Sequence, residues 1–287
     1  PLIRMREVDN FKEAHTAHAT LKEAEAQIKE AIEIYKKFFD SLVVPYKVTE
    51  RPDWDKFAGA LYSIAFDQIL PDGRTIQIGT VHNLGQNFSK AFDITYETEK
   101  GHREHVWQTC YGISGRPIVG MLAAHGDDNG AVLPPQMAPI QVLIVPIPSK
   151  EMEKQINETC QTVAAELKRA GIRTKLDVRI DLTPGSKFYY WELRGVPIRV
   201  EVGPRDVKQK EVTVVRRDTF DRQTVKTEKL IATMKQVMKT MTEEMRRKAW
   251  DWMNQHVCRV NSLEEAKRLQ QRRAGIAEVL WCGNAEC

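Results

Sequence analysis

A stretch rich in turn-forming residues divides the sequence into two parts with different patterns. The sixteen residues GDDNGAVLPPQMAPIQ, from 126 to 141, concentrate Gly, Asp, Asn and Pro, which interrupt helices and strands. Before this stretch, one long helical pattern is followed by short alternating runs. After it, a fully apolar run is followed by a helical pattern and further strand-like runs. A chain of 287 residues is long enough for two ordinary domains, so we expect two architectures.

The first part is expected to form an α+β domain on an antiparallel sheet. Residues 19–42 predict a helix with one apolar face, which Thr20 and Glu23 would open as a capping box. Strand-like runs follow at 60–66, 74–82 and 91–98, and the Asp-Gly pair between the first two is typical of a tight turn. The short apolar segment 118–125 resembles a buried helix.

The second part is expected to be an α/β domain from about 141 to 224. It shows an apolar strand at 141–147 and an amphipathic helix that Gly171 would end. Strand-like runs then follow, and this order predicts a right-handed βαβ unit in a mixed sheet. Beyond it, residues 226–257 contain neither Gly nor Pro and predict a long helix. Its apolar stripe, which we expect to pack in a core, is Leu230, Met234, Val237, Met241, Met245 and Trp252.

Charge and hydropathy exclude few classes of function. The net charge of +4 and the pI of about 8.7 permit a nucleic-acid partner without requiring one. No apolar run reaches the ~18 residues of a membrane span, and the chain does not open with a signal peptide. The five cysteines are unevenly spaced, which favours a reducing compartment. We therefore expect no membrane association and a cytoplasmic location.

One cysteine pair has a spacing found in metal sites. Cys282 and Cys287, in CGNAEC, have the spacing of half a four-ligand zinc site, but no second pair follows. Other familiar motifs are missing from the sequence: it contains no phosphate-binding P-loop, no G-x-S-x-G nucleophile elbow and no H-E-x-x-H metal motif.

Polar residues interrupt the predicted sheet of the first part at three places. Arg4 and Arg6 would share one face of a strand, where an anion such as a nucleotide phosphate would relieve their repulsion. Thr80 and His82 would also share a face, and Gly79 beside them would permit a close approach to the backbone.

The third place is QTCYGISGR, residues 108–116. Gly112 and Ser114 leave little side-chain bulk on one face of the predicted strand, and Arg116 follows at its end. A flat ring could lie on such a surface. Each place also has a purely structural explanation: a surface arginine, a core histidine, a bulge glycine. Three interruptions in one sheet nevertheless favour a shared pocket.

Taken in order, these stretches resemble archaeal and eukaryotic-type prolyl-tRNA synthetases, which are class II aminoacyl-tRNA synthetases. PLIRMRE and FKEAHTAHAT resemble the later part of motif 2, and DGRTIQIGTVHNLGQNFSKAF resembles a substrate-binding strand. QTCYGISGR with AAHGDDNGAVLPP resembles motif 3. KFYYWELRGVPIRVEVGPRD resembles the anticodon-binding domain, and CGNAEC resembles the first half of a C-terminal zinc motif.

The resemblance implies a role for each matching residue. It places ATP at Arg4, Gln77, Thr80, Ser114 and Arg116, with Arg4 and Arg116 as the catalytic cations. It places proline at Phe11, Glu13, His15, His82, Cys110 and Gly112. It assigns Glu201 and Arg205 to tRNA, and Cys282 and Cys287 to zinc.

The resemblance also implies domains and partners. Residues 1–137 would be the C-terminal part of a class II catalytic domain, 138–225 the anticodon-binding domain, and 226–287 a helical segment leading into a truncated zinc-type domain. The implied activity is ATP- and Mg²⁺-dependent charging of tRNA(Pro) with L-proline, by a homodimer. Motif 1 and the start of motif 2 would precede Pro1, so the chain is expected to be part of a longer protein. Two alternatives remain: a non-catalytic tRNA-binding fragment or paralogue, and an α+β nucleotide-binding protein unrelated to tRNA.

Overall fold

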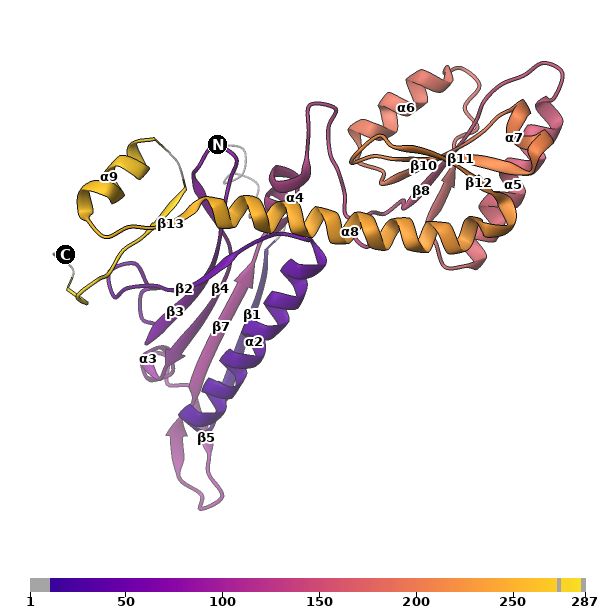
Figure 1. Cartoon of the computed structure of the whole chain (residues 1–287). Coiled ribbons are helices and arrows are strands. Elements are labelled where there is room, and N and C mark those ends of the chain that lie inside the picture. Colours follow the sequence, from indigo (N-terminus) through magenta and orange to yellow (C-terminus); the bar gives the residue numbers. More distant parts are fainter. Residues whose placement is uncertain (1–10, 273–274, 285–287) are drawn as a thin grey trace. The chain divides into compact units, whose positions relative to one another are not determined.

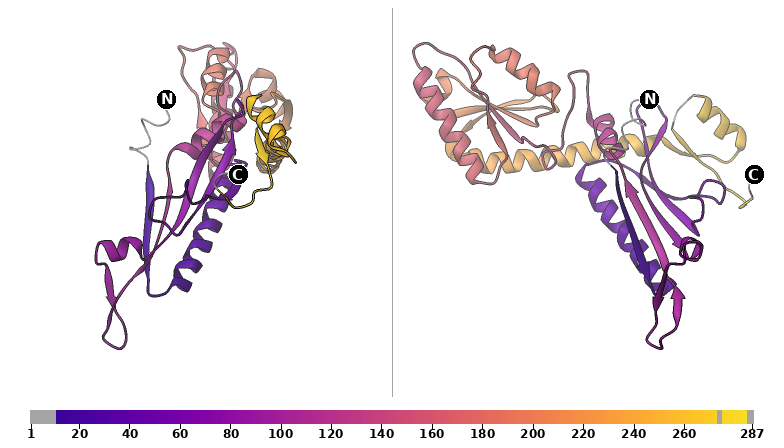
Figure 2. Two further views of the ribbon diagram at one scale, coloured as in Figure 1. Left: turned by 90° about the vertical axis from the view of Figure 1, so that its left-hand side faces the viewer. Right: turned by 180° about the vertical axis from the view of Figure 1, so that it is seen from behind.

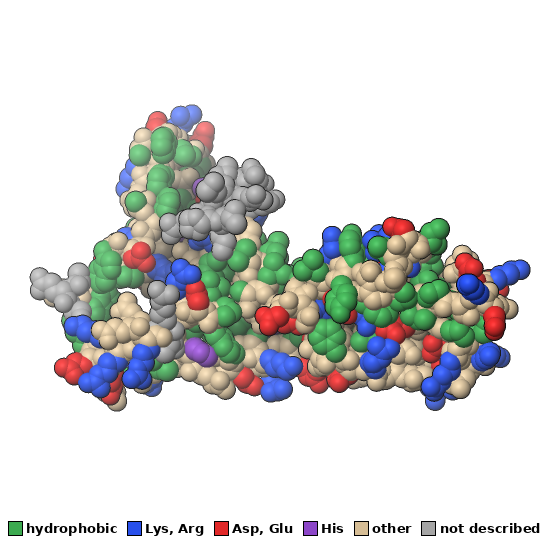
Figure 3. Space-filling model, turned by 90° about the horizontal axis from the view of Figure 1, so that it is seen from above, with side chains coloured by type: hydrophobic (Ala, Val, Ile, Leu, Met, Phe, Trp, Pro, Cys, Tyr) green, Lys and Arg blue, Asp and Glu red, His purple; other side chains and the backbone are tan. Residues whose placement is uncertain are grey.

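The computed structural model describes residues 11–272 and 275–284 (Figure 1). They form two compact units, each described here by itself. Unit 1 contains the chain up to Ala124 together with the residues from Ala249 onward. Unit 2 runs from His125 to Lys248. Charged side chains of both signs are interspersed over the face shown in Figure 3, in keeping with the small net charge.

Unit 1 is built on a five-stranded antiparallel sheet with the order β1-β7-β4-β3-β2. Its strands are β1 (Lys12–His18), β2 (Lys47–Glu50), β3 (Tyr62–Ile69), β4 (Thr75–Gly85) and β7 (Trp107–Ile113). Helix α2 (Leu21–Ser41) lies along one face of this sheet (Figures 1 and 2). This arrangement confirms the α+β domain on an antiparallel sheet.

Helix α2 begins and packs as its sequence predicts. Thr20 accepts a hydrogen bond from the Glu23 amide, and the Glu23 side chain accepts one from the Thr20 amide, which completes the capping box. The apolar face buries Tyr35 and Phe39, whose rings lie 6.0 and 5.1 Å from the ring of Phe66 on β3. Helix and sheet therefore share one aromatic core.

Two elements of unit 1 differ from expectation. Residues 91–98, expected as one strand, divide between helix α3 (Asn87–Ala91) and β5 (Thr95–Glu97), which pairs with β6 (Arg103–His105) in a separate hairpin. Asp93, in a left-handed conformation at φ 52°, makes the turn between them. Helix α4 (Arg116–His125) forms as predicted, but only one side is buried, because Ile118 and Leu122 are exposed.

Unit 2 is a mixed α/β sheet with the order β12-β11-β10-β8-β9. The strands β8 (Val142–Pro146), β9 (Thr174–Leu176) and β10 (Ile198–Val202) are parallel, with β9 at the edge of the sheet. The strands β11 (Glu211–Arg216) and β12 (Arg222–Lys226) are antiparallel to their neighbours. Helices α5 (Glu153–Arg169), α6 (Pro184–Leu193) and α7 (Pro204–Gln209) connect them. The predicted α/β domain with a mixed sheet is confirmed.

The long helix α8 (Leu230–Gln255) spans the boundary between the units. Leu230, Met234 and Val237 lie in the core of unit 2, together with α5 and the sheet. Residues 226–248 therefore belong to unit 2, whereas the predicted third segment began at residue 226. After α8 follow β13 (Val257–Arg259), α9 (Leu263–Gln271) and β14 (Ile276–Glu278). No helix in the described part of the chain has the length and apolarity to cross a bilayer.

Candidate active site

Strand pairing gathers the predicted proline-site residues of unit 1 on one sheet face. In the ladder register, Cys110 on β7 lies directly opposite His15 on β1 and His82 on β4. Two residues further along, the next row consists of Glu13, Gly112 and Thr80. Residues opposite each other in an antiparallel ladder point to the same side of the sheet. His15, His82 and Cys110, which are 28 to 95 positions apart in sequence, thus become neighbours.

The face concerned is the one opposite α2, as the environment of Gly79 shows. A Cβ added at Gly79 would lie 2.9 Å from Cζ of Phe39, so Gly79 faces helix α2. Because side chains alternate along a strand, Thr80 and His82 point to the other face of the sheet. Gly79 was expected to permit a close approach to the backbone, and the group that approaches it is the aromatic ring of Phe39 on the helix.

Glu13, His15 and Cys110 contact one another directly. The Cys110 thiol donates to Oε1 of Glu13 at 3.1 Å, and Nε2 of His15 lies 3.4 Å from Oε2 of Glu13. The hydrogen bond from Cys110 lowers the pKa of the Glu13 carboxyl, so this group is anionic at neutral pH. Burial raises the pKa of the Cys110 thiol to about 12, so the thiol stays neutral and donates.

His82 is held as a neutral ring beside this cluster. Its Nδ1 lies 2.7 Å from Oγ of Ser63 on β3, and its ring centroid lies 5.0 Å from that of Phe57. Burial lowers the pKa of His82, which favours the uncharged imidazole. The strands therefore present an anionic carboxylate, a neutral imidazole and an aromatic ring in one place.

A β-bulge places Gln77 on the same face as Thr80, although they are an odd number of residues apart. Gly79 pairs with Phe66 and Gln77 pairs with Asp67, so Ile78 is the extra residue in β4. One amino group of Arg116, at the start of α4, lies 3.4 Å from the Gln77 carbonyl oxygen. Gln77 and Thr80, predicted to bind the nucleotide, thus lie on one face of β4, and Arg116 at the start of α4 contacts the backbone of Gln77.

Ser114 fixes the start of α4. Its Oγ accepts a hydrogen bond of 3.2 Å from the Arg116 amide, as a cap of the helix end would. Gly112 lies under an aromatic ring, because a Cβ there would be 3.1 Å from Cζ of Phe11. We expected a flat ring over this small residue, and in this structure the ring is that of Phe11, another predicted proline-site residue.

Two further predicted residues lie outside the described part of the chain. Arg4 and Cys287 belong to segments whose structure is not described, so the roles predicted for them remain predictions. Cys282 is exposed, and its Sγ accepts a 3.4 Å hydrogen bond from the Asn284 amide. The proposed zinc pair therefore stays a prediction.

Phe57 and Ser63 both contact His82 of the candidate site, and the sequence did not indicate either of them. Phe57 lies in the loop before β3, and Ser63 lies within a buried strand where a small polar residue attracts no notice. Ser63 pairs directly with His82 across the ladder. Only this register reveals that its hydroxyl meets the imidazole.

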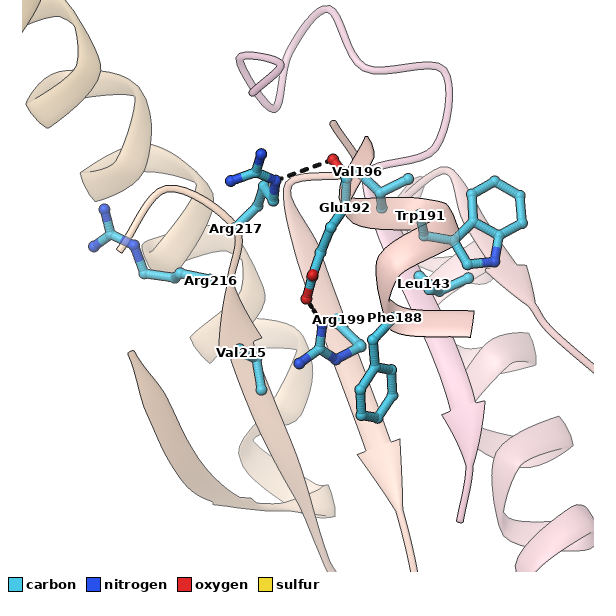
Figure 4. Close-up of a pocket in the computed structure, with 9 residues that line it drawn as sticks. All are labelled: Leu143, Phe188, Trp191, Glu192, Val196, Arg199, Val215, Arg216 and Arg217. Atoms are coloured by element: carbon cyan, nitrogen blue, oxygen red, sulfur yellow. Dashed lines mark hydrogen bonds and ion pairs between the residues drawn. The ribbon is translucent and has the colours of Figure 1, made fainter. Parts of the chain in front are cut away.

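In unit 2 the predicted tRNA residue Glu201 is already bound on both oxygens. It is buried, and it accepts hydrogen bonds from Nε of Arg199 at 2.9 Å and from an amino group of Arg222 at 2.5 Å. Arg199 also contacts Glu192 and stacks on the Phe188 ring at 3.8 Å, as Figure 4 shows in part. A base that paired with Glu201 would first have to displace an arginine.

The second predicted tRNA residue, Arg205, is largely exposed on α7. Its Nε lies 3.4 Å from Gln209 and 3.9 Å from Glu211, which are long contacts. Its neighbour Asp206 braces the turn, because its carboxylate accepts the Gly203 amide at 2.8 Å. The guanidinium of Arg205 thus remains accessible to a ligand at the carboxyl end of β10.

The sequence matches known proteins along its whole length. Residues 1–125 match the family model of the tRNA synthetase class II core domain (G, H, P, S and T), and residues 141–237 match that of the anticodon binding domain. The chain is 53% identical over 289 residues to a proline–tRNA ligase of Ignicoccus hospitalis and 50% identical over 287 residues to that of Methanopyrus kandleri. These alignments cover all of this chain and 60% and 59% of the relatives.

A solved structure agrees with the sequence matches. The crystal structure of prolyl-tRNA synthetase from Cryptosporidium parvum, complexed with halofuginone and AMPPNP, matches with a TM-score of 0.91 at 34% identity. The match covers 96% of this chain and 57% of that protein. The chain thus spans about 60% of the length of the proline–tRNA ligases it matches. Over its whole length the chain is therefore similar to proline–tRNA ligases, and it carries a region that matches the class II synthetase core and one that matches the anticodon binding domain.

Proposed function

We propose that this chain supplies the proline-binding face, part of the ATP site and the anticodon-binding domain of a proline–tRNA ligase. The enzyme activates L-proline with ATP and transfers it to tRNA(Pro). One observation carries the proposal: the sheet register brings His15, Cys110 and His82 into one row, beside a row with Glu13 and Thr80. These residues suit both ends of a small cyclic amino acid.

Proline carries a secondary ammonium and an apolar ring. The anionic carboxylate of Glu13 would bind the ammonium, because a charge-assisted hydrogen bond is about twice as strong as a neutral one. The rings of Phe57 and Phe11 and the neutral His82 would contact the methylene groups. We propose that Glu13 orients the substrate and that the rings select for its shape.

Activation requires cationic groups more than a protein nucleophile. The proline carboxylate attacks the α-phosphorus of ATP, the new acyl–phosphate bond forms, and pyrophosphate leaves. Positioning and stabilisation of charge supply most of the catalysis in such transfers. Arg116, placed beside Gln77 by the bulge, would stabilise the phosphate charge, and Arg4 would join it in the family arrangement. Thr80 and Ser114 would contact the nucleotide.

Magnesium would enter this site with the ATP phosphates. The carboxylate of Asp67, which pairs opposite Gln77, already accepts hydrogen bonds from Arg51 and Thr49 at 2.6 and 2.7 Å. It is therefore committed to structure, and we assign it no metal. When bound, Mg²⁺ neutralises phosphate charge, and the residues of this chain position the reactants around it.

Unit 2 would bind the tRNA anticodon. Single-stranded bases expose their pairing edges, and the exposed Arg205 at the end of β10 offers donors to phosphate or guanine. Glu201 would accept from a base only if Arg222 moved away. We also propose a homodimer in the cytoplasm, as expected of this family, and a structural zinc ion whose ligands include Cys282 and Cys287.

Proline-dependent exchange of pyrophosphate into ATP tests the proposal. The assay uses a protein of the relatives' full length that carries this chain, with each amino acid in turn. We expect exchange with proline and much weaker exchange with alanine, since each missing methylene costs about 1–3 kcal/mol of discrimination. Exchange that depends on a different amino acid, with proline inactive, would refute the substrate assignment.

A further inference from the structure

We propose that Glu13, His15 and Cys110 also form a binding site for one thiophilic divalent cation such as Zn²⁺. The proposed ligase reaction does not require such a cation here. The predicted zinc pair at Cys282 and Cys287 is a separate site. The three side chains offer a carboxylate oxygen, an imidazole nitrogen and a sulfur, all within 4.8 Å of one another.

The distances between pairs of donor atoms are close to those of a metal site. Zn²⁺ binds sulfur at about 2.3 Å and nitrogen or oxygen at about 2.0–2.2 Å in a tetrahedron, so the donors of such a site lie roughly 3.3–3.6 Å apart. Here Sγ of Cys110 lies 3.1 Å from Oε1 of Glu13 and 3.9 Å from Nε2 of His15, whereas Nε2 of His15 lies 3.4 Å from the other carboxylate oxygen, Oε2. Rotation of the Glu13 side chain, which would bring one oxygen toward both neighbours, would complete the geometry.

The backbone holds these donors in place without a metal. His15 and Cys110 are direct partners in the β1–β7 ladder, and Glu13 pairs with Gly112 two residues further along each strand. Because Gly112 has no side chain, nothing from that position of β7 intervenes beside the Glu13 carboxylate. Metal binding would therefore cost little conformational entropy. Most of the free energy of the metal–ligand bonds would contribute to the affinity for the metal.

The donor set selects the class of cation and leaves one position open. Sulfur and imidazole favour Zn²⁺, Co²⁺ or Cd²⁺ over Mg²⁺, which prefers oxygen ligands. The side chains of His15 and Glu13 are 56% and 42% exposed, so a fourth ligand can reach the metal. On binding, the sulfur–hydrogen bond of Cys110 is replaced by a sulfur–metal bond, and the proton passes to solvent.

The site would change what this sheet face binds. A cation held by Glu13 would compete with the ammonium of proline for the same carboxylate. This consequence rests on the proposed function, whereas cation binding itself does not. Metal binding can therefore be measured on the 287-residue chain without proline, ATP or tRNA.

Titration of the chain with Co²⁺ tests the site. We expect a thiolate-to-cobalt charge-transfer band in the near ultraviolet, and we expect Zn²⁺ to abolish this band. The proposed zinc pair at Cys282 and Cys287 would add a band of its own, so Cys110→Ser is made in a chain that also carries Cys282→Ser, and there it should abolish the band. Glu13→Gln and His15→Gln should weaken binding by about 10–100-fold or more, since even outer partners of metal ligands contribute that much. Cys258→Ser and Cys282→Ser are the matched controls and should retain the band.

Three results would overturn the proposal. They are the absence of a charge-transfer band in the unmodified chain, a band that persists when Cys110→Ser is combined with Cys282→Ser, and a band that only Cys282→Ser removes. Far-ultraviolet circular dichroism checks that each variant is folded. Should Cys110→Ser fail to fold, the partly exposed His15→Gln gives an independent answer, and unchanged affinity in that variant would equally refute the site.

Discussion

Replacement of Asp127 by Asn should lower the stability of unit 2, and the contacts of Asp127 indicate by how much. Asp127 accepts two hydrogen bonds from the guanidinium of Arg217, at 2.6 and 2.7 Å. The Arg217 side chain is only 1% exposed, and its Nε donates to the Glu192 carbonyl at 3.1 Å (Figure 4). Asp127 thus neutralises a buried cation and ties the turn-rich segment 126–141 to β11.

The expected loss follows from this geometry. Removal of one partner of a buried pair costs about 3–5 kcal/mol, because the remaining charge is left uncompensated. Asp127 is 37% exposed, and solvent therefore screens the pair in part. Asparagine also keeps one oxygen that can accept from Arg217. We therefore expect a smaller loss, of about 2–3 kcal/mol.

Hydrogen exchange measures this loss locally. A change of about 2–3 kcal/mol corresponds to roughly 30–150-fold faster exchange, since 1.4 kcal/mol is a factor of ten. We expect it for peptides of β11 and segment 126–141 in Asp127→Asn, with the sheet of unit 1 unchanged. Asp128→Asn, at the adjacent exposed position, is the matched control and should exchange like the unmodified chain.

The effect should depend on pH in a defined direction. The hydrogen bond from Arg217 lowers the pKa of the Asp127 carboxyl in the folded state. The ionised Asp127 carboxylate therefore contributes its full stabilisation above the ordinary aspartate pKa of about 4. This stabilisation is lost as the pH falls through the lower pKa that Asp127 has in the folded state. The difference in thermal stability between Asp127→Asn and the unmodified chain should be constant near neutrality and shrink in acid. Equal exchange in the Asp127 and Asp128 variants would refute the reasoning, and so would a difference that grows in acid.

Three further predictions concern the proposed activity of the full-length protein. Glu13→Gln should raise the KM for proline in pyrophosphate exchange by about 10-fold or more, because a hydrogen bond to a charged group contributes about 1.5–3 kcal/mol; an unchanged KM would contradict the role. Zn²⁺ should inhibit exchange competitively with proline, and inhibition that proline cannot relieve would argue against a shared carboxylate. Arg205→Ala should weaken tRNA binding while exchange is unchanged, whereas Lys208→Ala on the same helix serves as its control; equal losses in both would make Arg205 structural.

Local sequence patterns determined most of the elements. The Thr20–Glu23 capping box and the apolar face fixed the start and orientation of α2, because both depend on residues three or four apart. The β-α-β order of the second part likewise predicted its mixed sheet. The resemblance of the motifs to prolyl-tRNA synthetases predicted a set of proline-site residues, and the fold brings these residues together: Phe11, Glu13, His15, Cys110, Gly112 and His82.

Other features depend on contacts between distant segments, which no local pattern encodes. Side-chain alternation along β4 predicts Gln77 and Thr80 on opposite faces, but the bulge at Ile78 reverses this, and it exists only in the pairing with β3. Gly79 indicated a close approach to the backbone, but only the structure shows that the approaching group is the ring of Phe39, 40 residues earlier in the chain.

The sequence by itself therefore determined which segments become helices and strands and which motifs they carry. Tertiary structure decided which side chains meet: Ser63 with His82, Cys110 with Glu13, and two arginines with Glu201. The physical reason is that helix caps and side-chain periodicity act over a few residues of one chain segment. The register of a sheet and the satisfaction of a buried charge are settled only when distant strands pack together.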